Sequence, residues 1–426
     1  MLRIDGPFPA RYCDGVSRRS FLRIGAMGCA GIAAPLTLAG LLKADEAKGR
    51  NLGHKAIINI HLSGGPSHSD MFDLKPEAPV EFRGAFQPIR TNVPGFEICE
   101  HFPMLATMAQ RFTAIRSLVG LRDEHSNHQT QSGYIERDLA NAGGRPALGS
   151  VVAKLFGPTP SGSPPFVAYD GAPQGFIGPV YKGYRPDGGN LRLRGNLTEA
   201  RLDSRTNLLS QLDRLRRDLD RSGQMEALDA FTQRAVDVVT SGRVADALDV
   251  DKEPEPIRKR YGREGRQFLT ARRLIEAGVR VVTYNWGGWD THSDNFKHLS
   301  KQLPQLDQAM SSLLTDLAER GLDQDVAVVM WGEFGRTPRV NSQAGRDHWS
   351  KLGMAFLAGG GWRHCQAIGS SSRLAEEAKD RPVHLHEVFS TLYHHMGIDV
   401  HSQQLFDTVG RPQYLVDQRK LIDELV

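Results

Sequence analysis

Cysteine is scarce in this sequence. Only four occur among 426 residues, Cys13, Cys29, Cys99 and Cys365, and no two of them are spaced as CxxC. That spacing is typical of thiolate zinc sites and of thioredoxin-like redox motifs, so neither is expected. Cys99 and Cys365 leave two alternatives open: one disulfide in an oxidising compartment, or two free, buried thiols, which we favour.

Other features that the sequence lacks argue against further classes of function. The sequence contains neither GxGxxG nor CxxCH, which argues against a redox enzyme that carries a dinucleotide or a haem. The net charge is +4, but residues 1–44 hold six basic and two acidic side chains, so the rest of the chain is neutral. A neutral body argues against a nucleic-acid-coating protein, which needs a basic face. The hydrophobic fraction of 40% and the charged fraction of 24% are those of a globular protein and exclude collagen, coiled coils and wholesale disorder.

The N-terminus has the features of an export address. Arg18 and Arg19, within SRRSFLR, precede an uncharged run over residues 24–42. That run is long enough to span a bilayer, but its four glycines, five alanines and Pro35 favour a transient export segment over a permanent membrane span. The pair followed by Ser-Phe-Leu resembles a twin-arginine signal. We therefore predict a signal peptide and linker over residues 1–47, the twin-arginine translocation machinery as a partner, and a location in the periplasm, at the cell surface or outside the cell.

The body alternates short apolar runs with amphipathic segments, which predicts parallel crossovers and a layered α/β domain over residues 48–426. Strands are predicted at residues 55–62, 112–118, 279–285, 325–331 and 354–357, and helices at residues 101–111, 128–139, 148–156, 266–277, 303–320 and 385–396. Residues 157–195, rich in Gly, Pro and Ser, are predicted as long loops, and residues 198–250 as a helical layer. Together they form a predicted insertion over about 157–250.

Polar residues of a particular kind follow the predicted strands. In open parallel sheets, ligands bind beyond the carboxyl ends of the strands, so residues there are candidates for a site. They are His68, Asp70 and Asp73 after the first strand, His125, Ser126, His128 and Thr130 after the second, Asp290, His292 and Asp294 after the third, and Glu333, Arg336, Asp347 and His348 after the fourth.

Mixed carboxylates and imidazoles suit zinc, manganese, magnesium or calcium. We predict one or two divalent ions, with a ligand set of Asp70, Asp73, Asp290, His292, Glu333 and His348. Arg336 has a planar fork that suits a tetrahedral oxyanion, although it can instead form a structural pair with Glu333. His68, His125, Thr130, Asp294 and Asp347 are predicted to line the same pocket.

Longer motifs point to a family. The segments GGPSHSDMFDLKP, HSNHQTQSGY, GGWDTHSDNF, GEFGRTPRVN and GRDHW resemble the domain-of-unknown-function 1501 family, which is similar in fold to the alkaline phosphatase and sulfatase superfamily. The resemblance implies a layered αβα sandwich with a mostly parallel central sheet, and a metal site with a hydroxyl nucleophile. Ser126 and Thr130 are the candidate nucleophiles, with His128 and Arg336 beside Ser126 in the catalytic group. The sequence departs from the superfamily in three ways. Phe334 follows Glu333 where the superfamily has a histidine, and Asp290 and His292 are separated by one residue, closer than in phosphatases. No Cys-x-Pro-x-Arg motif exists, which excludes a sulfatase formylglycine.

Two functions follow from these patterns. The first is an exported metal-dependent hydrolase of phosphate or sulfate esters, acting on a small molecule or a polysaccharide, in which water or Ser126 attacks and Arg336 steadies the transferred group. The alternative is a non-catalytic exported binding protein that uses the same pocket for an anionic sugar or a surface polymer.

Overall fold

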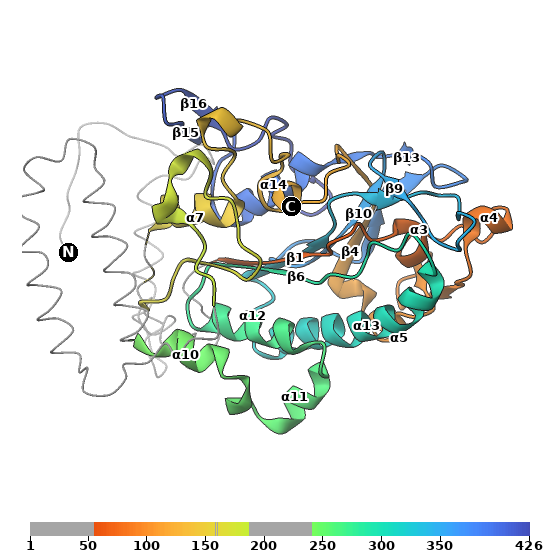
Figure 1. Cartoon of the computed structure of the whole chain (residues 1–426). Helices are drawn as coiled ribbons and strands as arrows, with labels where there is room; N and C mark the ends of the chain where they lie inside the picture. The colour runs from red at the N-terminus through yellow and green to blue at the C-terminus, as the bar shows by residue number, and fades with distance from the viewer. Residues whose placement is uncertain (1–54, 158, 160, 187–240) are drawn as a thin grey trace, which may run out of the picture. The chain divides into compact units, whose positions relative to one another are not determined.

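The computed structural model describes residues 55–157, 159, 161–186 and 241–426 (Figure 1). The chain divides into two units, residues 1–51 and residues 52–426, and only the second is described below. The predicted signal segment at 1–47 and most of the predicted helical layer at 198–250 lie outside the described residues.

A mixed, mostly parallel sheet organises the described part of the chain. Its eight strands comprise seven in the order β11 (Gln366–Ile368), β4 (Phe112–Val119), β10 (Gly353–Gly359), β7 (Val326–Trp331), β1 (Ala56–His61), β6 (Val281–Asn285) and β5 (Phe166–Ala168), with β14 (Val383–His384) also paired to β4. Only β10 runs antiparallel to its neighbours, β4 and β7. The α/β fold with a mostly parallel central sheet is thus as the sequence predicts.

Helices cover both faces of this sheet (Figure 1). Side chains alternate along β1, so that Ile58 and Ile60 join one hydrophobic cluster while Ile57 joins another. The first cluster contains residues of α12 (Arg266–Glu276) and α13 (Asn295–Glu319), and the second contains residues of α7 (Leu148–Phe156) and α14 (Leu385–His395). A strand buried on both faces is mostly apolar, as β1 is, and its two polar residues, Asn59 and His61, have hydrogen-bond partners.

Shorter elements complete the fold. Four two-stranded sheets pair β2 (Pro88–Arg90) with β3 (Glu97–Cys99), β8 (Gly335–Arg336) with β9 (His348–Trp349), β12 (Ser370–Ser371) with β13 (Ala378–Asp380), and β15 (Gln404–Phe406) with β16 (Pro412–Tyr414). The remaining α-helices are α3 (His68–Met71), α4 (Val80–Arg83), α5 (Pro103–Ala106), α6 (His128–Ser132), α10 (Arg243–Leu248) and α11 (Glu255–Tyr261). Single 3₁₀ turns lie at η1 (Ala109–Arg111), η2 (Ala140–Ala142), η3 (Gly175–Ile177), η4 (Pro179–Tyr181) and η5 (Val250–Lys252).

The structure departs from the predicted elements in several places. The helix predicted at residues 101–111 is divided into α5 and the 3₁₀ turn η1. The helix predicted at residues 128–139 ends at Ser132, because Gly133 takes a left-handed conformation with φ of 86° that terminates it. Helix α13 begins at Asn295, two turns before its predicted start. Within residues 157–195, predicted as loops, β5 adds a three-residue strand to the sheet edge.

Two further expectations concern the thiols and the membrane. Cys99 and Cys365 are both unpaired, but only Cys99 is buried, and Cys365 is exposed, so the prediction of two buried thiols is wrong for Cys365. Burial raises the pKa of the Cys99 thiol to about 12.

Among the helices of the described residues, none combines the length and the apolar character needed to cross a membrane.

Candidate metal centre

The candidate site lies where the parallel strands β1, β4, β6 and β7 end. His61 closes β1 and aligns with Asn285 at the end of β6 and with Trp331 at the end of β7. The loops that follow these strands therefore start at one edge of the sheet, and the β8–β9 hairpin brings a further segment to it. This is the edge at which open α/β sheets bind ligands.

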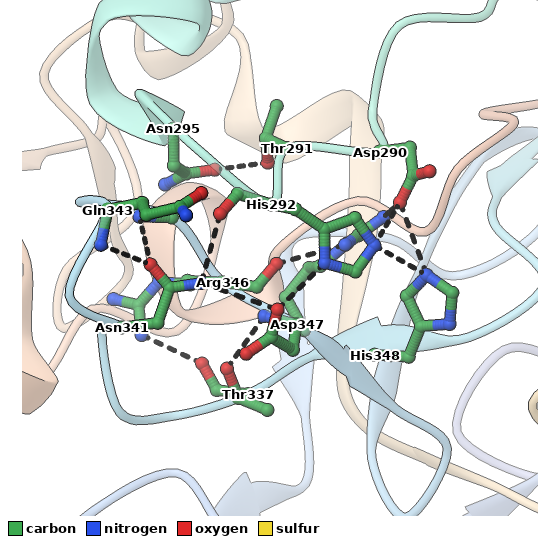
Figure 2. A network of polar contacts seen from close by, with 12 residues as sticks. Asp290, Thr291, His292, Asn295, Thr337, Asn341, Gln343, Arg346, Asp347 and His348 are labelled. Carbon is green, nitrogen blue, oxygen red and sulfur yellow. Dashed lines mark hydrogen bonds and ion pairs between the residues drawn. The ribbon is translucent and has the colours of Figure 1, made fainter.

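Four side chains from these segments, His125, Asp290, His292 and His348, converge; we call them the imidazole cluster (Figure 2 shows the last three). The Nε2 atom of His348 lies 3.1 Å from His125 Nε2, 3.0 Å from His292 Nε2 and 3.2 Å from Asp290 Oδ1. Asp290 Oδ1 is also 3.0 Å from His292 Nε2. Donor atoms of His125, Asp290 and His348 all lie within 4.8 Å of one another, close enough to share one metal ion.

Each imidazole of the cluster has a carboxylate at its other nitrogen. His348 Nδ1 donates to Asp123 Oδ1 at 2.7 Å, and His292 Nδ1 donates to Asp347 Oδ1 at 2.7 Å. His125 Nδ1 lies 3.4 Å from the carboxylate of Glu333. A proton held at Nδ1 leaves a lone pair at Nε2, which is the arrangement that metal-binding histidines show.

The lone pairs of these Nε2 atoms face one another at short range. Two acceptor nitrogens 3.0 Å apart repel unless a proton or a metal cation lies between them. The three rings also touch through their faces and edges, with centroids 4.6 Å apart for His125 and His348 and 4.8 Å apart for His292 and His348. The chemistry of this donor set therefore fits a bound cation.

Asp290 is held in its charged form by a buried arginine. Arg336 is fully buried and donates from its Nε to the Gly65 carbonyl at 2.9 Å, and it also donates to the Gly64 carbonyl and to Asp290 Oδ1. Burial alone would raise the pKa of Asp290, but the hydrogen bond and the charge of Arg336, together with the hydrogen bond to His348, lower it. Arg336 thus pairs with Asp290 rather than with Glu333.

Glu333 lies next to His125 of the imidazole cluster, and its two carboxylate oxygens have different surroundings. Its Oε1 accepts a hydrogen bond from the Gly64 amide at 2.8 Å, while its Oε2 is buried and has no hydrogen-bond partner in the described part of the chain. His61 Nε2 is 3.7 Å from that oxygen, and burial lowers the pKa of His61 to about 4, so this ring is neutral. Burial also raises the pKa of Glu333. Glu333 is placed behind His125 rather than among the four converging donors.

Three of the residues predicted near the first strand lie in contacts of their own. Asp70 is buried and pairs with Arg346 through two bonds of 2.8 and 2.9 Å, and it accepts a third from Asn295 at 3.0 Å. Asp73 pairs with Lys75 at 2.9 Å and accepts from Ser371. His68 is fully buried, and burial lowers the pKa of its imidazole. Neither carboxylate has a described contact with the imidazole cluster.

The residues predicted around the nucleophile are distributed around the loop after β4. Ser126 Oγ accepts a weak hydrogen bond from the His128 amide at 3.4 Å, and both side chains are partly exposed. Thr130 is buried, and its hydroxyl contacts His61 Nδ1 at 2.9 Å. Asp294 is exposed and precedes α13 in a left-handed conformation, with φ of 50°. Of these, only Thr130 connects to Glu333, through His61.

The prediction from sequence did not include Asp123 in the site. Asp123 fixes His348 although 225 positions separate the two residues. Its one available signal is position, since it precedes His125 by two residues in the same strand-end segment, DEHSNH. His61 was not among the predicted site residues either; it is buried at the end of β1 and contacts Glu333.

Fold and site together define an α/β protein with an imidazole-rich candidate metal centre at its strand ends. The chain belongs to the family described as "Protein of unknown function (DUF1501)", which matches residues 54–426. None of the curated proteins matches the sequence.

Two solved structures are distantly similar. Both are crystal structures of Ps i-CgsB, one of them in complex with k-i-k-neocarrahexaose. The complex is 9% identical with a TM-score of 0.36, and the other structure is 11% identical with a TM-score of 0.37. Each match covers 82% of this chain and 73% of the other chain. Similarity at this level assigns neither an activity nor a ligand to the present protein.

Proposed function

We propose that this protein is an exported, alkaline-phosphatase-like, metal-dependent hydrolase of phosphate or sulfate esters. The observation that carries the proposal is the convergence of side chains on His348 Nε2 at the carboxyl edge of the sheet: His125 Nε2, His292 Nε2 and Asp290 Oδ1 each lie 3.0–3.2 Å from it. We assign His125, Asp290, His292 and His348 as ligands of a single divalent ion.

The spacing of these donors suits a small transition ion. Zinc binds nitrogen and oxygen ligands at about 2.0–2.1 Å, so two ligands at the corners of a tetrahedron are about 3.3 Å apart. The separations of 3.0–3.2 Å from His348 Nε2 to the other three donors are close to that edge, and the separation of 3.7 Å between His125 Nε2 and Asp290 is somewhat longer. Three imidazoles favour zinc or a similar transition ion over magnesium and calcium, which prefer oxygen ligands.

One ion is favoured over two. A second ion would need carboxylates such as Asp70, but both oxygens of Asp70 are engaged by Arg346. The ring of Phe334 packs on His125 and His348, with centroids 5.1 and 4.3 Å away. This apolar contact fills the space beside Glu333 and supports the two rings.

The chemistry follows from the donors and their surroundings. A bound divalent ion polarises the ester oxygen and lowers the pKa of water. Asp123 and Asp347 fix the rings of His348 and His292, and Arg336 keeps Asp290 ionised. His125, Asp290 and His292 are each nearly half exposed, at 49%, 45% and 46% of the side chain, so an ester can approach from solvent. Arg336 therefore acts on Asp290 in this proposal, and water is the preferred nucleophile over Ser126.

A second function is favoured by one specific observation. Four protein ligands complete a tetrahedron, and closed four-ligand shells are typical of structural metal sites, whereas catalytic zinc sites keep one position for water. A non-catalytic protein that holds a metal and binds an anionic sugar or a surface polymer fits that count.

Metal analysis and hydrolysis assays separate these functions. We expect the purified protein to hold about one transition ion per chain and to hydrolyse nitrophenyl phosphate or nitrophenyl sulfate, and His348→Ala to lose both properties while remaining folded. His401→Ala, which removes an exposed histidine outside the cluster, is the matched control and should retain both. Stoichiometric metal without hydrolysis of any phosphate or sulfate ester would support the binding protein. A folded protein that binds no metal would contradict both.

A further inference from the structure

A second pocket opens at the same edge of the sheet and is not part of the imidazole cluster. Its volume is about 580 Å³, and it lies where the segments after β5 and β6 meet the start of α12. Tyr169, Asn285 and Trp286 line it from the sheet, and Arg263 and Arg266 line it from the helical side. We call it the β6 pocket.

Two arginines give the β6 pocket free positive charge. The side chain of Arg263 is 97% exposed and that of Arg266 is 61% exposed. Within the described residues, the carboxylates paired with them are those of Glu264, which also lines the pocket, and Asp251, and each lies 3.8 Å away, beyond hydrogen-bonding distance. Both guanidinium groups can therefore donate to an anion, and their planar fork suits sulfate, phosphate or carboxylate oxygens.

The opposite wall combines an aromatic ring with polar atoms that lack partners. Trp286 is partly exposed, and its ring packs edge-to-face on Phe268 with centroids 5.1 Å apart, which fixes its orientation. Tyr169 Oη and Asn285 Oδ1 are buried and have no hydrogen-bond partner among the described residues. A buried polar atom without a partner is costly, and a ligand that offers hydroxyl groups would satisfy both the phenol and the amide oxygen.

The β6 pocket and the imidazole cluster are neighbours. The Trp286 amide donates to the His61 carbonyl at 2.8 Å, and His61 in turn contacts Glu333, which lies behind His125. Asp290 follows Trp286 by four residues, so their Cα atoms are at most about 14 Å apart. One extended ligand can therefore reach both places.

We propose that the β6 pocket binds an acidic sugar residue of an oligosaccharide whose ester group lies at the imidazole cluster. The proposal rests on the hydrolase function proposed above and adds its substrate class. Trp286 packs against the apolar face of the sugar ring, Arg263 and Arg266 bind its acid group, and sugar hydroxyls satisfy Tyr169 and Asn285. An aromatic wall, paired cations and unpaired polar atoms in one pocket are the requirements of an anionic carbohydrate.

Calorimetric titration of the intact protein tests the proposal. The probes are a panel of sulfated tetrasaccharides of glycosaminoglycan, galactan and fucan type, their desulfated forms, neutral maltotetraose and a glutamate tetrapeptide. We expect at least one acidic tetrasaccharide to bind, with affinity falling as salt is added, and maltotetraose and the tetrapeptide to bind at least tenfold more weakly. Comparison of sulfated with desulfated uronate-containing forms shows whether sulfate or carboxylate is recognised. Binding of the tetrapeptide as tight as that of the best saccharide, or no binding by any saccharide, would overturn the proposal.

Variants locate the binding to the β6 pocket. Arg266→Gln removes an exposed charge and should weaken binding of the acidic tetrasaccharide by about 10- to 100-fold, as expected for a lost hydrogen bond to a charged group. Arg260→Gln is the matched control, because Arg260 is also on a nearby helix but pairs with Glu319 at 2.8 Å and does not line the pocket. Equal affinity of the two variants would overturn the assignment. Trp286→Ala serves as a second probe, with its fold checked by circular dichroism.

Turnover distinguishes failure of this proposal from failure of the hydrolase. Arg266→Gln should raise KM for the saccharide ester about tenfold, whereas Arg260→Gln should leave this KM and the hydrolysis of nitrophenyl sulfate or nitrophenyl phosphate unchanged. If the small esters are hydrolysed and Arg266→Gln does not affect the saccharide, only the subsite is refuted. If Arg266-dependent binding occurs without hydrolysis of any ester, the subsite stands and the hydrolase function is refuted.

Discussion

Two groups of charged side chains in this molecule both contain carboxylates, but the carboxylates have different roles in the two groups. In the imidazole cluster, carboxylates lie at the Nδ1 atoms of partly exposed histidines, and the Nε2 atoms face one another and can share a ligand. In the second group, which we call the arginine network, Glu253 and Asp316 are buried against Arg272 at 2.8 and 2.9 Å, and Arg320 binds the same two carboxylates at 2.9 Å each. The Arg272 side chain is only 1% exposed.

The two groups differ in whether the partner of the carboxylate keeps an atom that can bind a ligand. A guanidinium offers only donors, so an arginine paired with carboxylates keeps no acceptor atom that could bind a cation. An imidazole donates from one nitrogen and keeps an acceptor on the other, so a carboxylate–histidine pair still has one ligand atom to offer. We therefore read the arginine network as structural and the imidazole cluster as functional. Asp70, bound by Arg346, belongs with the first kind of pairing.

A substitution that breaks the arginine network should have the largest effect on the free energy of unfolding. Arg272→Met removes the guanidinium and leaves Glu253 and Asp316 buried with less compensation, because Arg320 reaches them from a more exposed position. Breaking a buried ion pair from one side costs about 3–5 kcal/mol. We expect a loss of that size in the free energy of unfolding, measured by urea denaturation.

A control for this variant is available in the neighbouring helix. Arg260 pairs with Glu319 at 2.8 Å, but these side chains are 30% and 56% exposed. Exposed ion pairs contribute about 0–1 kcal/mol, so Arg260→Met should change the free energy of unfolding by no more than that. Equal losses for Arg272→Met and Arg260→Met would remove the distinction between the buried network and ordinary surface pairs.

His395 extends the comparison, because it is a buried imidazole that has no carboxylate partner among the described residues. Burial lowers the pKa of His395 to about 4, and its Nε2 lies 3.1 Å from each of two carbonyls, those of Ala56 and Asp325. The unfolded chain takes up this proton near pH 6.5 while the folded one resists it to about pH 4, so stability falls as the pH drops through that window. A difference of this size corresponds to about 3 kcal/mol.

Urea denaturation at pH 7 and at pH 4.5 measures this effect. In His395→Gln the residue no longer titrates, so the loss of stability on acidification should be smaller than in the wild-type protein by up to about 3 kcal/mol. The same loss in both proteins would mean that His395 is protonated equally in the folded and unfolded states. Histidines of the imidazole cluster, which have carboxylates at Nδ1, are not altered by the substitution.

The next effect concerns Asp123. Asp123 fixes the ring of His348, and the His348 side chain is only 19% exposed, so water reaches this ring less easily than the ring of His292, although Asp123 itself is 60% exposed. Loss of such a partner typically lowers metal affinity about 10- to 100-fold. We expect Asp123→Asn to fall toward the upper end of that range in a zinc competition titration, with the fold unchanged. An unchanged affinity would show that His348 is not a ligand or does not need its partner.

The sequence predicted the fold better than it predicted the pairings within the site. Apolar runs in β1 and β7 marked buried strands, and the carboxyl ends of parallel strands necessarily meet at one edge, so the neighbourhood of Asp290 and His348 was predictable. The edge strand β5 was missed because three residues flanked by glycine, proline and serine give too short a pattern.

Which polar residues face each other could not be read from the sequence. Asp70 and Arg346 are 276 positions apart, and Asp123 and His348 are 225 apart, and no local pattern links either pair. Both aspartates follow a strand and stand close to a histidine in the sequence, yet one is bound by a buried arginine and the other by an imidazole. Tertiary packing alone decides which carboxylate is neutralised and which supports the imidazole cluster.

The smallest effect is expected for a substitution of Asp347, the partner of His292, and concerns the zinc affinity. His292 is 46% exposed, against 19% for His348, so water can accept the Nδ1 proton of His292 when the carboxylate is removed. Asp347→Asn should therefore lower zinc affinity by about tenfold or less, at the low end of the range for such partners. The hydrogen bond from His292 lowers the pKa of Asp347, so this carboxylate is ionised at the neutral pH of the titration. A loss larger than that of Asp123→Asn would mean that exposure does not set the strength of these carboxylate–histidine pairs, and that His292 rather than His348 is the central ligand.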